Sequence, residues 1–311
     1  MSAPVAPWTG ATNADVWTID GLTFNAGADA NGVEWIINSD TGWFGSAPSR
    51  NNRVSKNNAH GAYRSPVYRD PRVVAVSGYV IAPTPALREQ AGYTLAALLS
   101  DPNTLYPITR SEVTGPRLIY AEQDTDTVVS VLPDGIGCTL AFSMQFAAPD
   151  PRKVGATLNS VSTTMPNPGS GGVLWQGDAT IPNGLPYLGD DHVSGIVYGT
   201  AGTGGLLTMT NPGGAPADVL FTITGSVNTP SLVRQDTGDE MTFASSLSLT
   251  DVLTIDTGSG QVLFDGANYR PFMSVFQPII IPPQTTITVA YSALLGSPST
   301  TVTAQWRTTD W

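Results

Sequence analysis

Apolar and polar residues alternate along most of this chain in short runs, and Gly, Asp, Asn and Pro separate the runs. A period of two residues is typical of strands with one buried face, and closely spaced turn residues keep such strands short. The run 15–25 carries apolar residues on both sides of Asp20-Gly21, a pair that favours a tight hairpin turn. Further strands are predicted at 32–45, 73–82, 104–110, 117–122, 127–132 and 138–146.

One segment has helical spacing instead. Within 84–102, apolar residues recur every three or four positions, at Leu87, Ala91, Leu95 and Leu98. Thr84 is suited to the N-cap and Pro85 to the first helical position, where its missing N–H leaves no bond unmade. The sequence therefore predicts one helix over 85–100 in an otherwise β-rich domain.

The run 138–146 leads into Ala148-Pro149-Asp150-Pro151, where two prolines interrupt the pattern. The charge changes at the same place. Residues 1–153 carry 11 Lys+Arg and 14 Asp+Glu, a net charge of −3, whereas the remainder carries 3 and 11, a net charge of −8. We expect an N-terminal domain at 1–153, with Pro149, Asp150 and Pro151 as the inter-domain joint.

The second half is irregular at first. Residues 154–200 are rich in Gly, Pro and Asn, which favours a linker. From 201 to 311 short apolar runs return with turns about every 8–12 residues, a spacing typical of a β-sandwich or jelly roll.

The polar segment 46–72 contains six of the fourteen Lys+Arg of the chain. Its Asn pairs and scattered Pro predict a long loop or extended arm. Two interpretations stay open: a solvated loop, or an arm that is ordered by the acidic surface of a neighbouring subunit. In the second case the candidate subunit-interface residues are Arg50, Arg53, Lys56, His60, Tyr63, Arg64, Tyr68, Arg69 and Arg72.

The chain offers little for catalysis. It has two histidines, and His192 follows Asp190-Asp191 in a segment that we interpret as a solvated turn rather than a metal site. Carboxylate pairs such as Asp124 with Asp126 lie in sequences typical of turns. We expect no enzyme activity, no cofactor and no metal.

The overall charge of −11 and the pI of 4.4 argue against sequence-specific DNA binding. No run approaches ~18 uninterrupted apolar residues, so no membrane-spanning helix is expected. Trp17, Trp35 and Trp43 are expected in a core or an interface, and the single cysteine, Cys138, in a core. Trp175 is a weak candidate for stacking on a glycan.

Taken in order, several segments resemble the distal tail proteins (Dit) and related minor tail proteins of long-tailed, non-contractile bacteriophages. The resemblance rests on "IDGLTF", "GVEWIINSDTGWFGSAPSR", "HGAYRSPVYRDPRVVAVSGYVIAPT", the helix "LREQAGYTLAALLS" and "FSMQFAAPDPRK". In the second half it rests on "NPGGAPADVLFTITGSVNTPSLVRQDTG", "LTIDTGSGQVLFDG" and "TVTAQWRTTDW".

The resemblance implies an N-terminal domain that forms a ring, with six copies expected, and a galectin-like C-terminal sandwich. It implies a structural virion protein at the distal end of the tail, assembled in the bacterial cytoplasm. The implied partners are further copies of the chain, the tail tube protein, the tape measure and other tail-tip proteins. DNA would pass through the lumen without specific binding. The alternative is a carbohydrate-binding module that recognises a host cell-wall glycan.

Overall fold

The computed structural model describes residues 15–51, 53–132, 138–167, 173–175, 196–198, 203–297 and 299–311. The chain divides into two compact units. Unit 1 comprises Met1–Thr157, Gly213–Ala215 and Arg307–Trp311; unit 2 comprises Leu158–Pro212 and Pro216–Trp306. Strands dominate both, and the described ranges contain one α-helix, so the predicted fold class is confirmed.

The strands of unit 1 are β1 (Trp17–Ile19), β2 (Leu22–Phe24), β3 (Glu34–Thr41), β4 (Ser49–Asn51), β5 (Val67–Arg69), β6 (Arg72–Ile81), β7 (Tyr106–Arg110), β8 (Arg117–Val131) and β9 (Thr139–Ala148). Apart from β4 and β5, which pair only with each other, these strands form two antiparallel orders that share β8, namely β2-β1-β7-β8 and β3-β6-β9-β8. The first part of β8 pairs with β7 and its later part pairs with β9. The predicted hairpin around Asp20-Gly21 is confirmed as β1–β2, with both turn residues at positive φ.

The prediction of two strands at 117–122 and 127–132 is wrong, because β8 continues through the acidic segment between them. Its register against β9 shifts between Gln123 and Thr125 and again between Thr125 and Val128. Extra residues in one strand form bulges, which bend the strand without reversing it. The sequence around Asp124 and Asp126, which we expected to be a turn, is this bulged part of β8.

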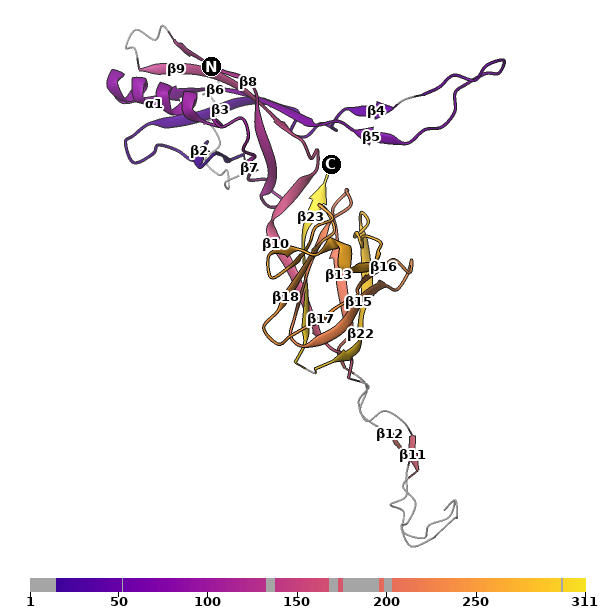
Figure 1. The fold of residues 1–311 in the computed structure, drawn as a ribbon. Coiled ribbons are helices and arrows are strands. Elements are labelled where there is room, and N and C mark those ends of the chain that lie inside the picture. Colours follow the sequence, from indigo (N-terminus) through magenta and orange to yellow (C-terminus); the bar gives the residue numbers. More distant parts are fainter. Residues whose placement is uncertain are drawn as a thin grey trace, which may run out of the picture. The chain divides into compact units, whose positions relative to one another are not determined.

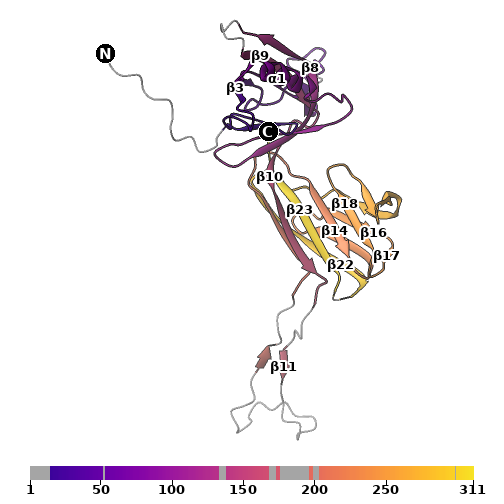
Figure 2. The same cartoon turned by 90° about the vertical axis from the view of Figure 1, so that its left-hand side faces the viewer.

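The helix α1 (Pro85–Ala97) begins as predicted, with the Thr84 side chain accepting a hydrogen bond from the Leu87 N–H at 3.3 Å. It ends three residues earlier than expected, since Leu99 adopts a φ of 54°. The Leu99 N–H instead donates to the Asp20 carboxylate at 3.2 Å. Through Ala91 and Leu95, α1 packs on the sheet of β6, β8 and β9 (Figure 2).

The core of unit 1 contains the tryptophans that the sequence placed there, Trp17, Trp35 and Trp43, all at most 5% exposed. Trp17 and Trp43 meet edge to face with ring centroids 4.9 Å apart. Cys138 is buried and forms no disulfide.

The strand β10 (Lys153–Thr164) begins in unit 1, where it pairs with β8, and ends in unit 2. The sequence predicts a linker from residue 154 onward, whereas residues 154–164 continue β10. The unit boundary falls inside this strand, between Thr157 and Leu158. Pro149–Pro151 lies entirely in unit 1, on the connection from β9 to β10.

Unit 2 contains the remaining elements: β11 (Val173–Trp175), β12 (Ile196–Tyr198), β13 (Leu206–Asn211), β14 (Val219–Thr224), β15 (Val227–Arg234), β16 (Glu240–Phe243), β17 (Ser246–Leu247), β18 (Val252–Asp256), β19 (Val262–Phe264), β20 (Ala267–Asn268), the 3₁₀ turn η1 (Arg270–Phe272), β21 (Met273–Phe276), β22 (Thr285–Gly296) and β23 (Thr301–Asp310). The last residues of β23 belong to unit 1.

Two antiparallel sheets build the sandwich of unit 2, and β11 pairs with β12 separately from them. One has the order β23-β14-β18-β19-β20, and the other has the order β13-β22-β15-β16-β21 with β17 beside β15. Figure 2 shows β23, β14 and β18 lying next to one another in the first sheet. Residues from both sheets, including Phe221, Leu232, Ile255, Val289 and Val302, form a single buried cluster. A sandwich with one core between two sheets is what the alternating pattern of 201–311 predicted.

Candidate assembly surface

One hairpin of unit 1, here called the arm (residues 46–71), extends away from the rest of the unit (Figure 1). Its strands β4 and β5 pair antiparallel, with Arg50 opposite Tyr68. The pairing continues toward the tip, where the Tyr63 N–H donates to the Val54 carbonyl at 2.9 Å and the Lys56 N–H to the Gly61 carbonyl at 3.0 Å. The segment predicted as an extended arm is therefore a two-stranded ribbon.

The arm has no core of its own, because every residue of β4 and β5 is exposed. Four large apolar side chains of the arm are more than half exposed: Val54, Tyr63, Val67 and Tyr68. An isolated two-stranded ribbon is at best marginally stable in water. Apolar side chains that stand free on such a ribbon are typical of a surface that becomes covered in an assembly.

The structure brings together eight of the nine predicted interface residues on this exposed ribbon: Arg50, Arg53, Lys56, His60, Tyr63, Arg64, Tyr68 and Arg69. Arg50 forms a long ion pair with Asp70 at 3.8 Å, and the Lys56 ammonium lies 5.9 Å from the Tyr63 ring centroid. Arg69 donates to the Ala47 carbonyl at 2.9 Å and lies over the Trp311 ring. Among the described residues, Arg53 and Arg64 form no ion pair.

Arg72 differs from the other eight, since it is only 1% exposed and lies under the base of the arm. Its Nε donates to the Pro151 carbonyl at 2.8 Å. Its Nη1 donates to the carbonyls of Gly42, Trp43 and Gly45 at 2.6, 3.0 and 2.7 Å. Burial lowers the pKa of the guanidinium, and the nearby Arg69 lowers it further. Arg72 therefore connects the arm to the Gly-Trp turn and to the proline segment.

A second buried cation, Lys153, reinforces the same place. Its Nζ donates to the Trp43 carbonyl at 3.2 Å and lies 5.4 Å from the Phe44 ring centroid. Burial lowers the pKa of this ammonium, an effect that the charge of Glu112 opposes. Glu112 in turn accepts a hydrogen bond from Trp43 Nε1 at 2.7 Å. The turn at 42–45 is thus stabilised by hydrogen bonds from Arg72 and Lys153 to its carbonyls, and by the buried Trp43.

The backbone of the turn requires a glycine at position 42. It adopts a φ of 87°, and a Cβ added there would lie 2.0 Å from the Val73 carbonyl oxygen. Only glycine combines this φ with so close a backbone approach. The close contact brings the carbonyls of the turn within reach of Arg72 at the start of β6.

The predicted joint, Pro149-Asp150-Pro151, is fixed to the same base. Asp150 forms an ion pair with Arg152 at 2.8 Å, and the Pro151 carbonyl accepts from Arg72. The sequence alone does not show that Arg72 contacts both the joint and the base of the arm. The alternation along β6 does indicate that Arg72 is buried. Arg72 lies two residues before Val74 and four before Val76, so its side chain is on the same buried face of the strand.

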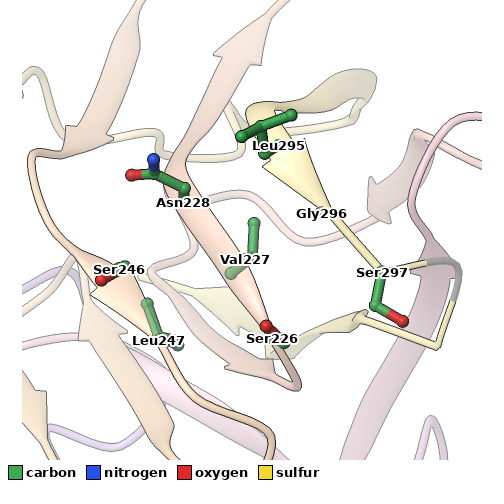
Figure 3. Close-up of a pocket in the computed structure, with 8 residues that line it drawn as sticks. All are labelled: Ser226, Val227, Asn228, Ser246, Leu247, Leu295, Gly296 and Ser297. Carbon is green, nitrogen blue, oxygen red and sulfur yellow. The ribbon is translucent and has the colours of Figure 1, made fainter.

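The alternative function, glycan binding, would need a site on unit 2. An open depression of ≈ 300 Å³ lies there between β15, β17 and β22 (Figure 3). Ser226, Asn228, Ser246 and Ser297 supply polar groups, and Leu295 supplies apolar surface. No aromatic ring lines it, although stacking on an aromatic ring is a common way to bind a sugar. Trp175 ends β11, and its side chain lies outside the described residues.

No group of three or more potential metal-ligating side chains is found in the ranges that the structure describes. Asp190, Asp191 and His192 lie outside those ranges. Where the chain is described, no helix combines the length and the apolar character needed to cross a bilayer.

No protein-family model and no curated protein sequence matches this chain. Its fold is similar to that of Dit (gp 19.1) of phage SPP1, which is described as a paradigm of the hub adsorption apparatus in phages that infect Gram-positive bacteria. That similarity has a TM-score of 0.62 at 13% identity and covers 94% of this chain and 98% of the SPP1 chain. Two further structures are chains of the phage P2 baseplate in its activated conformation, one with Ca and one with Sr, both at 12% identity. The structure with Ca gives a TM-score of 0.48 and covers 94% of this chain and 97% of its own. The structure with Sr gives a TM-score of 0.49 and covers 94% of this chain and 98% of its own. The fold expected from the sequence resemblance is confirmed.

Proposed function

We propose that this chain is a structural protein of a bacteriophage tail tip, where copies of unit 1 form a ring between the tail tube and the host-adsorption apparatus. One observation carries the proposal: the fold matches that of the SPP1 hub protein over nearly the full length of both chains. A match over 94% of this chain includes residues of both units. The family resemblance in the sequence suggests six copies in the ring.

The physical character of unit 1 supports a role in assembly. A free ribbon with exposed tyrosines and arginines gains stability when a partner covers it. The buried cations Arg72 and Lys153 bind backbone carbonyls at the base of that ribbon and so fix the base to the rest of unit 1. A rigid base reduces the conformational entropy lost when the arm docks.

The proposed place is the distal end of the tail in the virion, after assembly in the bacterial cytoplasm. The neighbours there would be the tail tube protein, the tape measure and other tail-tip proteins. Unit 1 carries a net charge of −3, from 12 Lys+Arg and 15 Asp+Glu. An acidic lumen would repel phosphates, so DNA would pass through it without specific binding.

Labelling of intact particles tests the proposal. Gold-conjugated antibodies raised against the purified chain are bound to virions of the source phage and viewed by electron microscopy. We expect label at the tail end that lies away from the capsid. Label on the capsid or along the tail tube, or none on particles whose protein content includes the chain, would refute the proposed location.

A further inference from the structure

We propose that the arm of one copy binds the free edge of β8 in a second copy of this chain. The proposal rests on the proposed function in one respect, because it requires copies of the chain to assemble. It adds the identity of the surface that receives the arm.

The later part of β8 is an open sheet edge. From Glu122 to Val131, β8 pairs with β9 on one side, and none of the described strands pairs with its other side. Unpaired backbone N–H and C=O groups along an edge strand favour the addition of another strand.

The first half of the opposite edge of the same sheet is covered by its own chain. The side chain of Asn25 donates to the Ile37 carbonyl at 3.1 Å and accepts from the Ile37 N–H at 2.9 Å. The Asn25 N–H donates to the Trp35 carbonyl at 2.8 Å. These bonds occupy outer backbone groups of β3 at Trp35 and Ile37, whereas no such bond is found along the outer side of β8 from 122 to 131 among the described strands.

Charge favours the arm as the added element. The two bulges of β8 carry the exposed carboxylates Asp124 and Asp126, with Glu122 close by. Asp124 accepts a hydrogen bond from Gln145, and no ion pair to these three carboxylates forms among the described residues. The arm is the basic segment of the chain, with Arg53, Lys56 and Arg64 exposed near its tip.

Most other carboxylates of unit 1 already have partners within the unit. Asp15 and Asp40 bind Arg110 at 2.6 and 3.0 Å. A separate set of carboxylates pairs with arginines or a tryptophan: Asp70, Glu89, Asp150 and Asp310 with Arg50, Arg88, Arg152 and Arg117, and Glu112 with Trp43. Glu122, Asp124 and Asp126 are therefore three carboxylates close together in sequence that form no ion pair among the described residues, as is also true of Asp20, Asp29, Glu34 and Asp101 elsewhere in unit 1. Opposite charges direct docking and its register.

Apolar surface and length also correspond. On β8, Val128 and Val131 are 62% and 57% exposed and lie next to the acidic bulges. On the arm, the exposed Val54 and Tyr63 likewise lie next to arginines. At ~3.3 Å per residue, the arm from Ser49 to Asn58 and the edge from Glu122 to Val131 each extend about 30 Å.

The arm and the β8 edge are different surfaces, and each copy carries one of each. Repetition of such a heterologous contact gives a closed ring if its rotation closes, and a filament if it does not. The contact is thus of the kind that a ring of identical copies needs.

Cross-linking between two singly substituted chains tests the contact. Tyr63→Cys is made in one preparation of the full chain and Val128→Cys in another, with different affinity tags, and the two are mixed and oxidised. We expect a mixed disulfide dimer at least about tenfold more abundant than either homodimer, because only the mixture places one cysteine on each side of a heterologous contact. The unsubstituted chain, which retains the buried Cys138, serves as the background.

Charge reversal then tests the chemistry of the contact. Arg53→Glu with Arg64→Glu in the arm partner is expected to lower the cross-linked fraction at least about tenfold, and Asp124→Lys with Asp126→Lys in the edge partner to restore it. Glu89→Lys on α1 is the matched control and should leave the fraction unchanged. Equal cross-linking in all mixtures, no mixed dimer, or no restoration by the second reversal would overturn the proposal. Gold label at the tail end together with such a result would refute only this contact and leave the proposed function standing.

Discussion

Replacement of Arg72 by methionine removes a buried charge and keeps most of the length of the side chain. In the native structure Nε and Nη1 of Arg72 donate to four backbone carbonyls, those of Pro151, Gly42, Trp43 and Gly45. Methionine cannot donate to any of them. The carbonyls would then face an apolar side chain at a site that is only 1% exposed.

The loss can be estimated from these contacts. Nη1 has two hydrogens for three carbonyls, so the contacts correspond to about three hydrogen bonds from a charged donor, each contributing about 1.5–3 kcal/mol. The substitution also relieves the desolvation of a buried guanidinium, which costs several kcal/mol. We therefore expect Arg72→Met to lower the free energy of unfolding of unit 1 by about 3–5 kcal/mol, a large part of the 5–15 kcal/mol typical of a domain.

Hydrogen exchange measured in increasing urea, with peptides resolved by mass spectrometry, gives the stability of each unit separately. Peptides from β6 and β9 report on unit 1, and peptides from β14 and β15 report on unit 2 in the same sample. Arg50→Met is the matched control, since the Arg50–Asp70 pair is long and exposed and its loss is expected to change stability by less than about 1 kcal/mol.

If Arg72→Met leaves the unfolding free energy of unit 1 within about 1 kcal/mol of the native value, the buried cation does not hold the base of the arm together. An equal loss in Arg50→Met would show that any arginine in this region has the same effect. Either result would refute the reasoning.

Three further predictions follow from the described contacts. Burial raises the pKa of Tyr291 from 10.0 to about 12, so the folded state keeps this proton while the unfolded state loses it, and stability falls as the pH rises from about 10 to 12. Between pH 9 and 11 the native chain should lose about 1.4 kcal/mol more than Tyr291→Phe in urea titrations, and parallel pH curves would contradict this. Gly78→Ala should destabilise unit 1 by about 2–3 kcal/mol, because the new Cβ would lie 1.8 Å from the Ile36 carbonyl oxygen. Gly45→Ala is the control and should be nearly neutral, since its Cβ would meet nothing within 4 Å. Equal melting temperatures for the two variants would refute the clash. Thr84→Ala should cost about 1 kcal/mol through loss of the N-cap bond, whereas Thr84→Ser should retain it; calorimetry that finds the two variants equal would show that the cap does not contribute.

Much of the fold could be predicted because its signals are local. The hairpin at Asp20-Gly21, the helix start at Thr84-Pro85 and the alternating runs of unit 2 each depend on residues within a few positions of one another. The errors lie where a local signal has two structural outcomes. The segment Asp124–Asp126 has the composition of a turn, and the same composition suits a bulge when a partner strand such as β9 continues past it.

The candidate surface could be predicted in outline only. Six basic residues in one polar segment indicate an arm, but they do not show which cation is buried. Arg72 is distinguished from Arg69 by long-range contacts, since its carbonyl partners come from segments near residues 43 and 151. The free edge of β8 could not be inferred either, because an edge exists only once the strand order is known.

The sequence by itself determined that this protein is mainly β, where its helix begins, and that one basic segment stands out in an otherwise acidic chain. Those properties follow from side-chain periodicity and turn chemistry, which act over a few residues. Only the tertiary structure decided that Arg72 ties the ribbon to the proline segment, that the unit boundary lies inside β10 and that β8 presents an open edge. These depend on which distant backbone groups meet, because the burial of a charge and the pairing of a strand are properties of the folded arrangement.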